Sequence, residues 1–153
     1  MKIGINARRL QESKSGVTNY MRHVYSRIEK MENYTPIYLD FSLFKKQFPT
    51  MGKTFVLLPE TVTNVLFDLF FVNLLARKEQ IDIFHGPSHV LPFFMDKKMR
   101  YVVTIHDLAF FYPNTTSSQF FTIYYKFITR YSTKHASHVI PVSENTKKDI
   151  VTF

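Results

Sequence analysis

The length and composition of the sequence are those of one globular domain. The chain has 153 residues, of which 45% are hydrophobic and 21% charged, so it can bury a core and is not typical of a disordered protein. The absence of cysteine excludes a disulfide scaffold and a thiolate metal site. A formal net charge of +8 favours anionic partners: nucleotide diphosphates, an acidic lipid surface or nucleic acid.

The sequence predicts neither an export signal nor a membrane span. Arg8 and Arg9 come before any apolar signal region could form. The most apolar segment, residues 65–75, carries Asp68 and Asn73 and is short for a bilayer. The basic residues form scattered pairs, with no basic stripe and no recognised RNA-binding signature, so nucleic acid is not expected as a partner. We therefore expect a cytoplasmic protein.

Strands and helices are predicted to alternate, which is the pattern of a parallel α/β sheet. The expected strands are residues 1–6, 36–40, 54–58, 81–84, 100–105 and 138–142. Residues 7–15 are expected to form a loop, and a polar, lysine-bearing stretch, 42–53, separates the second and third strands. Four helices are expected. The first is 16–31, and the second is capped by Thr61 or Thr63 and ends near Lys78. The third is 117–134, and the last is capped by Ser143.

We expect one domain, 1–153. The last helix has about ten residues, near the usual minimum, and no glycine stop or closing strand follows it. This ending predicts a truncation, or a fragment of a longer protein.

Two aromatic segments offer candidate binding surfaces. In the helix 117–134, the steps of three and four place four side chains in the core, at Phe120, Tyr124, Phe127 and Tyr131. A second pair, Phe121 and Tyr125, is left for a partner, an acceptor channel or a lipid surface. The basic and aromatic loop 44–48 is of a kind that can rest on anionic lipid, although ordinary surface is the preferred interpretation.

Polar residues follow four of the predicted strands. Because ligands of open parallel sheets sit beyond the carboxyl ends of the strands, these residues are the candidates for a binding site. They are residues 6–16, His85-Gly86-Pro87, His106-Asp107 and Ser143-Glu144-Asn145-Thr146.

Five strings in this order resemble the N-terminal domain of family 4 retaining glycosyltransferases. They are Ile3-Gly4-Ile5-Asn6-Ala7-Arg8, Ser15-Gly16-Val17-Thr18-Asn19-Tyr20, Asp82-Ile83-Phe84-His85-Gly86-Pro87, Val103-Thr104-Ile105-His106-Asp107-Leu108 and the run from Val142 to Ile150. The resemblance covers essentially the whole chain and implies one half of a GT-B enzyme. That half is a Rossmann-like parallel sheet flanked by helices on both faces, lacking the donor-binding C-terminal domain.

The resemblance implies a donor site around the first helix start and the fifth strand. Ser15, Gly16 and Val17 would lie against the donor diphosphate, and the physics agrees, because a helix N-terminus attracts phosphate. A second glycine is common in the family where this chain has Thr18. His106 would touch the donor sugar near the anomeric centre, with Asp107 orienting it or binding acceptor hydroxyls. Without the resemblance, the simpler interpretations are that Gly16 is a plain helix-entry glycine and that His106-Asp107 is a strand-end pair that bridges loops.

The acceptor site implied by the resemblance comprises Arg8, His85, Gly86, Ser143 and Glu144. Ser143 also suits a helix cap, and Glu144 suits the helix dipole. His85 and His89 are four residues apart, but Pro87 lies between them, and no carboxylate or cysteine nearby completes a ligand set. No metal and no cofactor are expected.

The resulting hypothesis is a half-domain of a glycosyltransferase that transfers a sugar, with retention, from a nucleotide-sugar donor to a glycan or lipid-linked acceptor. A mannosyltransferase-like role in polysaccharide or lipopolysaccharide synthesis fits the resemblance. We expect the chain alone to be inactive, because the missing domain binds most of the donor. The charge favours peripheral association with an anionic membrane surface. The alternatives are a non-catalytic module for a phosphorylated or glycosidic ligand and, less favoured, a nucleic-acid binder.

Overall fold

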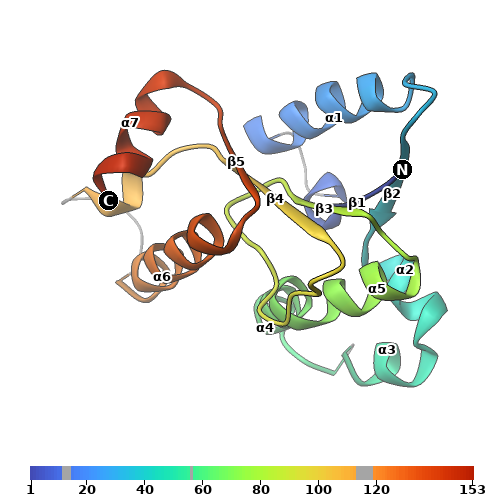
Figure 1. Ribbon diagram of the computed structural model, residues 1–153. Helices are drawn as coiled ribbons and strands as arrows, with labels where there is room; N and C mark the ends of the chain where they lie inside the picture. Colours follow the sequence, from blue (N-terminus) through green and yellow to red (C-terminus); the bar gives the residue numbers. More distant parts are fainter. Residues whose placement is uncertain (12–14, 56, 113–118) are drawn as a thin grey trace.

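Five parallel strands form a single sheet in the order β2-β1-β3-β4-β5 (Figure 1). The computed structural model describes residues 1–11, 15–55, 57–112 and 119–153. The strands are β1 (Lys2–Asn6), β2 (Thr35–Leu39), β3 (Ile83–Gly86), β4 (Arg100–Ile105) and β5 (His138–Pro141). All four strand pairs are parallel, so the predicted Rossmann-like α/β architecture is confirmed.

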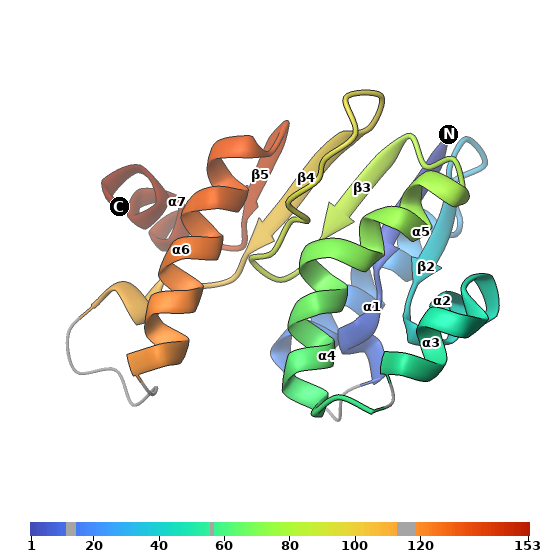
Figure 2. The same cartoon turned by 90° about the horizontal axis from the view of Figure 1, so that it is seen from below.

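Helices cover both faces of the sheet, as predicted. Right-handed crossovers place α1, which leads from β1 to β2, on one face and the helices that lead onward from β2 and β4 on the other. Figure 1 shows α1 and α7 on one side of the strands, and Figure 2 shows α4, α5 and α6 on the opposite side. The helices are α1 (Gly16–Ile28), α2 (Phe41–Gln47), α3 (Pro49–Phe55), α4 (Glu60–Leu66), α5 (Val72–Lys78), α6 (Gln119–His135) and α7 (Glu144–Thr152).

The two faces bury cores of different size. The face under α1 holds a small cluster centred on Ile5, Met21 and Tyr25. The opposite face holds the larger cluster, in which the rings of Phe84 and Tyr101, from adjacent strands, contact each other at a tilt of 42°. Because strands of a parallel sheet are covered on both sides, they are apolar along their length rather than alternating.

The predicted strand at 54–58 is wrong. Thr54 and Phe55 end α3, and Leu57 and Leu58 lie in a turn, while residue 56 is outside the described part of the chain. The polar stretch before it forms α2 and α3. Asp40 caps α2 by accepting from the Leu43 N–H at 2.8 Å, and a proline begins α3, so local capping favours helix where a short apolar run alone is ambiguous.

The helix predicted to end near Lys78 is present but differs in two details. Pro59, rather than Thr61 or Thr63, precedes α4 as the N-cap residue. Between α4 and α5 the helix widens into a π-helical segment, η2 (Phe67–Phe71). Similar segments in helices often accompany functional sites. The loop expected at 7–15 contains a short 3-10 helix, η1 (Arg8–Gln11), and its residues 12–14 are not described.

The face of α6 that packs inward differs from the prediction. Phe120 and Phe127, which we expected in the core, are 75% and 59% exposed. The buried positions of α6 are Ile128, Thr129 and Ser132. An aromatic helix offers several three-and-four patterns at once, so spacing alone does not select the inward face. The predicted helix start at 117 lies outside the described residues.

The basic and aromatic segment 44–48 is not a surface loop. Residues 44–47 belong to α2 and Phe48 is its C-cap, and Phe44 is buried among the rings of Phe67 and Phe71. The aromatic side chains of this segment therefore pack in or against the core, so they do not form a lipid-binding surface.

Candidate functional site

The carboxyl ends of the strands place the site between β1 and β3. In the order β2-β1-β3-β4-β5, the connection leaving β1 turns to β2, whereas the next one crosses back to β3 on the other side. This reversal is the switch point at which open α/β sheets bind ligands. Two adjoining hollows lie here and share four residues, Arg9, Ser88, Phe121 and Tyr125.

The first hollow, which we call the switch-point hollow, has a volume of about 270 Å³. Its lining comes from the segments after β1 and β3, from α4 and η2, and from α6. The lining residues are Asn6, Arg8, Arg9, Thr61, Asn64, Val65, Asp68, Pro87, Ser88, Val90, Phe121, Tyr124 and Tyr125. Polar groups thus converge from the sheet edge, and aromatic rings face them from α6.

A buried carboxylate organises the floor of the switch-point hollow. Asp68, on η2, accepts from the Asn6 side-chain amide at 2.8 Å and from the Arg8 guanidinium at 2.8 to 3.2 Å through Nη2 and Nε. The Arg8 and Asp68 side chains are only 15% and 8% exposed. Arg8, predicted to bind acceptor, therefore lines the hollow with its guanidinium already held by a charge-assisted pair.

The second hollow, the His106 hollow, has a volume of about 250 Å³ and lies beyond the ends of β3 and β4. Its lining residues are Arg9, Val17, Ser88, His89, His106, Asp107, Phe110, Phe121, Thr122 and Tyr125. The predicted residues Val17, His106 and Asp107 are thus brought together at one place. The N-terminus of α1 and the end of β4 face the same hollow.

His106 is held by one hydrogen bond and one ring contact. Its Nε2 lies 2.8 Å from the Pro87 carbonyl oxygen, and the Tyr20 ring meets it edge-on at 5.2 Å. Because a carbonyl oxygen only accepts, Nε2 must carry the proton, and Nδ1 of the neutral ring is then an acceptor. His106 can therefore accept one hydrogen bond from a hydroxyl group through Nδ1.

His85, predicted to bind acceptor, faces the interior instead of the hollows. Its Nδ1 lies 2.9 Å from the Tyr25 hydroxyl and its Nε2 lies 2.8 Å from the Thr104 hydroxyl. Burial, and second the nearby His106, lower the pKa of His85 to about 4. Burial also raises the pKa of Tyr25. Thr104 in turn contacts the Tyr20 hydroxyl at 3.1 Å, so this buried network supports the ring that packs on His106.

His89 is a site residue that sequence reasoning considered only as a metal ligand. It lines the His106 hollow, is 7% exposed and has a positive φ of 62°. Among the residues that the structure describes, its buried Nδ1 has no hydrogen-bond partner. Burial first, then His106, lowers the pKa of His89 to about 4, so the ring is neutral near pH 7. A neutral, strained and unsatisfied side chain beside a hollow is typical of a functional position.

The first helix, α1, begins at Gly16, where the sequence predicts a helix start. Ser15 is the N-cap and accepts from the Thr18 N–H at 3.1 Å. The first N–H groups of a helix have no intrahelical acceptor, and Gly16 has open space where a side chain would stand. Thr18, at the position where the family often has glycine, is buried and donates its hydroxyl to the Arg9 carbonyl oxygen at 3.2 Å.

The remaining predicted residues are not on the lining of either hollow, except Asp107. The Asp107 side chain is bonded to the Ala109 N–H at 3.1 Å, not to the His106 ring. Gly86 lets the chain turn back closely, since a Cβ there would collide with the Val90 carbonyl oxygen. Ser143 caps α7, which confirms that prediction, and Glu144 is exposed beside Lys147 at 3.9 Å.

Several lining residues were missed or left open by the sequence analysis. Phe121 and Tyr125, which it left for a partner or an acceptor channel, line both hollows. Asp68 was noted only as a charge in an apolar segment. That placement is itself the signal: an acid inside an apolar helix is buried, and a buried acid needs cationic or donor partners. Ser88 carried no signal, because only the fold brings it to the edge.

The described residues contain neither a candidate metal site nor a candidate membrane span. Within residues 1–11, 15–55, 57–112 and 119–153, no group of three or more histidine, aspartate or glutamate side chains is arranged to hold a metal ion. In the same part of the chain, no helix combines the length and apolar character needed to cross a bilayer.

Comparison with known proteins gives a family. The model of Glycosyltransferase Family 4 matches residues 15–153, from the N-cap of α1 to the last residue. No match was found among curated proteins or among solved structures. The matched range includes the N-terminus of α1, the segment after β3 and the end of β4, all of which contribute to the lining of the His106 hollow. The chain therefore belongs to Glycosyltransferase Family 4.

Proposed function

We propose that this chain is the acceptor-side domain of a glycosyltransferase that moves a sugar from a nucleotide-sugar donor to a glycan or lipid-linked acceptor, with retention of configuration. The observation that supports it is the meeting of the two hollows at the switch point. His106 and the N-terminus of α1 border one hollow, and the aromatic rings of α6 separate it from the other. Polysaccharide or lipopolysaccharide synthesis is the setting that this chemistry fits.

In this proposal the donor's reacting end occupies the His106 hollow. The first-turn N–H groups of α1 and the Arg9 guanidinium face the diphosphate and stabilise the charge that develops as it leaves. Nδ1 of His106 accepts a hydrogen bond from a hydroxyl of the transferred sugar. Asp107 is exposed on the same lining. Its Oδ1 accepts from the Ala109 N–H, and its Oδ2 would accept a hydrogen bond from a sugar hydroxyl group.

The acceptor occupies the switch-point hollow. Phe121 and Tyr124 offer ring faces to a sugar, and Asn64 and Ser88 offer hydrogen-bonding groups. Each hollow is slightly smaller than the roughly 300–1,000 Å³ of an ordinary ligand pocket. That size suits one wall of a cleft, and we propose that a second, donor-binding domain supplies the other wall and that the chain alone is inactive.

The test is a pair of measurements on the isolated chain. The chain is titrated with a panel of oligosaccharides by calorimetry, and it is incubated with nucleoside diphosphate sugars and the same oligosaccharides in a transfer assay. The proposal expects oligosaccharide binding that His106→Gln leaves intact and Phe121→Ala weakens, together with no transfer. Transfer by the isolated chain would contradict the half-domain reading.

A positive control completes the test. When a donor-binding domain from another member of the family is supplied, transfer should appear and should be lost in His106→Gln. Tight oligosaccharide binding without transfer under these conditions would favour a non-catalytic binding module instead. Tight, salt-sensitive binding of single-stranded oligonucleotides would favour a nucleic-acid binder.

A further inference from the structure

The outer face of α6 combines exposed apolar and basic side chains. Phe120, Ile123 and Phe127 are 75%, 69% and 59% exposed. Three basic side chains stand among them one turn apart and, with Ile123 and Phe127, line a groove of about 460 Å³: Lys126, Arg130 and Lys134. The helix from Gln119 to His135 contains no acidic residue. On most surface helices the exposed face is polar and carries both signs of charge, so this face is unusual.

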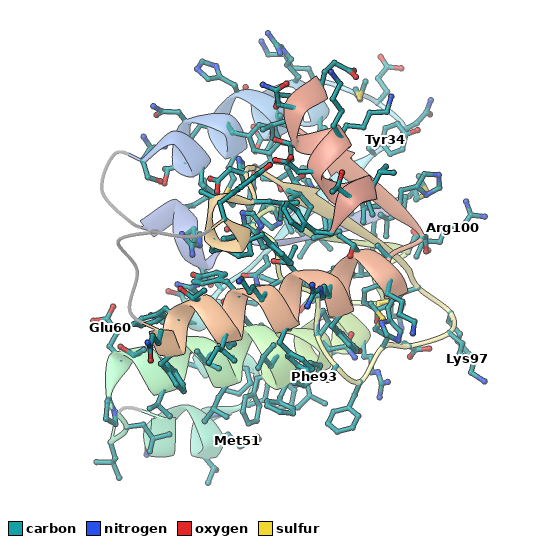
Figure 3. The ribbon with its side chains drawn as sticks, turned by 90° about the vertical axis from the view of Figure 1, so that its left-hand side faces the viewer. Tyr34, Met51, Glu60, Phe93, Lys97 and Arg100 are labelled. Atoms are coloured by element: carbon teal, nitrogen blue, oxygen red, sulfur yellow. The ribbon has the colours of Figure 1, made fainter. Side chains whose placement is uncertain are left out.

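Aromatic side chains extend this face beyond the helix. The Phe93 ring contacts the rings of Phe127 and Phe70, and Phe70 in turn contacts Phe94, which is 67% exposed. Figure 3 shows Phe93 below α6, between this helix and the α4–α5 side of the molecule. The exposed rings of Phe127 and Phe94 are thus joined by one series of aromatic contacts.

We propose that the outer face of α6, made by Phe120, Ile123, Phe127, Lys126, Arg130 and Lys134, docks on a membrane surface that contains anionic lipid. Apolar side chains would enter the headgroup boundary, and the basic side chains would pair with lipid phosphates. The charge of the chain, +8, has the sign that this contact needs. The contact is peripheral, because α6 lies flat and does not span the bilayer.

A lipid surface fits this face better than a protein partner does. Lysine is depleted in the centre of protein interfaces, where its ammonium group would lose water. At a membrane, a lysine buries its alkyl chain and keeps its charge among the headgroups. Here Lys126 and Lys134 flank Ile123 and Phe127 on the same groove, rather than forming a separate polar rim.

Docking in this orientation identifies the class of acceptor. The opposite face of α6 carries Phe121, Tyr124 and Tyr125, which line the switch-point hollow. One helix diameter, roughly 10–12 Å, therefore separates the membrane surface from this hollow. The sugar headgroup of a lipid-linked acceptor would reach the hollow while its tail stays in the bilayer. This assignment of the acceptor rests on the proposed function, whereas the docking itself does not.

Vesicle flotation tests the docking. The chain is mixed with vesicles of phosphatidylcholine alone or of phosphatidylcholine with phosphatidylglycerol, at low and high salt. We expect binding to the anionic vesicles only, weakened by salt because the charges are screened. The variant K126E/R130E/K134E should lower the partition coefficient at least roughly tenfold. The control K45E/K46E/K53E makes the same change in net charge on α2 and α3 and should alter it by less than about twofold.

Two single variants test the docking at side chains whose replacement is not expected to disturb the fold. Lys126 and Arg130 lie over the Phe111 ring, so their replacement could disturb packing. Ile123→Glu and Lys134→Glu change side chains that are exposed on the same face, and each should weaken anionic-vesicle binding severalfold while circular dichroism stays unchanged.

Several outcomes would overturn the docking. They are equal binding to both vesicle types, no binding to either, or an equal loss in the control variant. Self-association in sedimentation velocity that Ile123→Glu abolishes would assign the face to a protein partner. A chain that floats normally but binds no oligosaccharide defeats the proposed function and leaves the docking intact, and the reverse result defeats only the docking.

Discussion

The hydroxyl of Thr146 donates a hydrogen bond to the main-chain carbonyl oxygen of His106 at 3.0 Å. Thr146 is in the first turn of α7 and also gives its N–H to the N-cap Ser143. The same arrangement occurs at α1, where Thr18 gives its N–H to Ser15 and its hydroxyl to the Arg9 carbonyl oxygen. Each capped helix start is thus tied to the segment that carries a residue of the His106 hollow.

Thr146→Val should therefore destabilise the chain by about 1 kcal/mol, because it removes the buried hydroxyl and leaves the carbonyl oxygen of His106 without this donor. Urea unfolding followed by circular dichroism measures the free energy of unfolding. Thr152→Val is the matched control, since that hydroxyl donates to the Lys148 carbonyl oxygen within the end of α7 itself. The control should stay within about 0.5 kcal/mol of the parent chain. Equal effects of the two changes would show that the hydrogen bond to His106 adds nothing to the free energy of unfolding.

Asp68→Ala should cost about 3–5 kcal/mol in the free energy of unfolding. The change leaves the Arg8 guanidinium buried without its carboxylate and the Asn6 amide without its acceptor. Chemical denaturation of the two chains gives the comparison.

Glu144→Ala is the control for the Asp68 experiment, because Glu144 forms an exposed ion pair with Lys147. It should cost no more than about 1 kcal/mol. A loss below about 1 kcal/mol for Asp68→Ala would contradict the role of this carboxylate in organising the switch-point hollow.

The order of the elements was predictable where pattern and end signals agree. The strand Arg100–Ile105 was predicted with its observed ends, because a continuous β-branched run ends at a His-Asp pair. The predicted strand at 54–58 failed because a short apolar run fits strand and helix alike. The exposed side of α6 was mispredicted for a related reason: its apolar residues cover more than one face.

The strand ends that form the site could be predicted from the sequence, but the direction in which each side chain points could not. His106, Asp107 and Val17 were expected from their positions, and they do meet at one hollow. His85 follows the same rule in sequence, yet the alternation of a strand turns its side chain toward Tyr25, away from the hollow. Asp68 lies far from the other site residues in sequence, so only the tertiary fold relates it to Arg8.

Acid should destabilise the chain below about pH 6.5 because of His85 and His89. Their pKa values are lowered from 6.5 to about 4 in the folded chain, mainly by burial. The unfolded chain therefore takes up protons first, and stability is full above pH 6.5 and is lost as the pH falls toward 4. Each histidine contributes at most about 3 kcal/mol over this window.

Urea unfolding at pH 7, 5.5 and 4 measures the acid effect. His85→Gln should lower stability at pH 7, because it replaces a doubly hydrogen-bonded ring, and should flatten the decline toward pH 4. His23→Gln replaces an exposed histidine of α1 and should leave the slope unchanged. A slope that is the same in all three chains would mean that His85 is not the group that takes up the proton.

Phe121 and Phe120 are adjacent in α6 and test the acceptor site as a matched pair. Phe121 lines both hollows, whereas Phe120 is 75% exposed on the outer face. Phe121→Ala should weaken the binding of a water-soluble oligosaccharide by roughly tenfold, because about 1 kcal/mol or more of ring contact is lost. Phe120→Ala should leave it within about twofold, since a soluble ligand makes no use of the outer face. Calorimetric titration of both chains decides the matter, and a larger loss for Phe120→Ala would place the sugar on the opposite side of the helix.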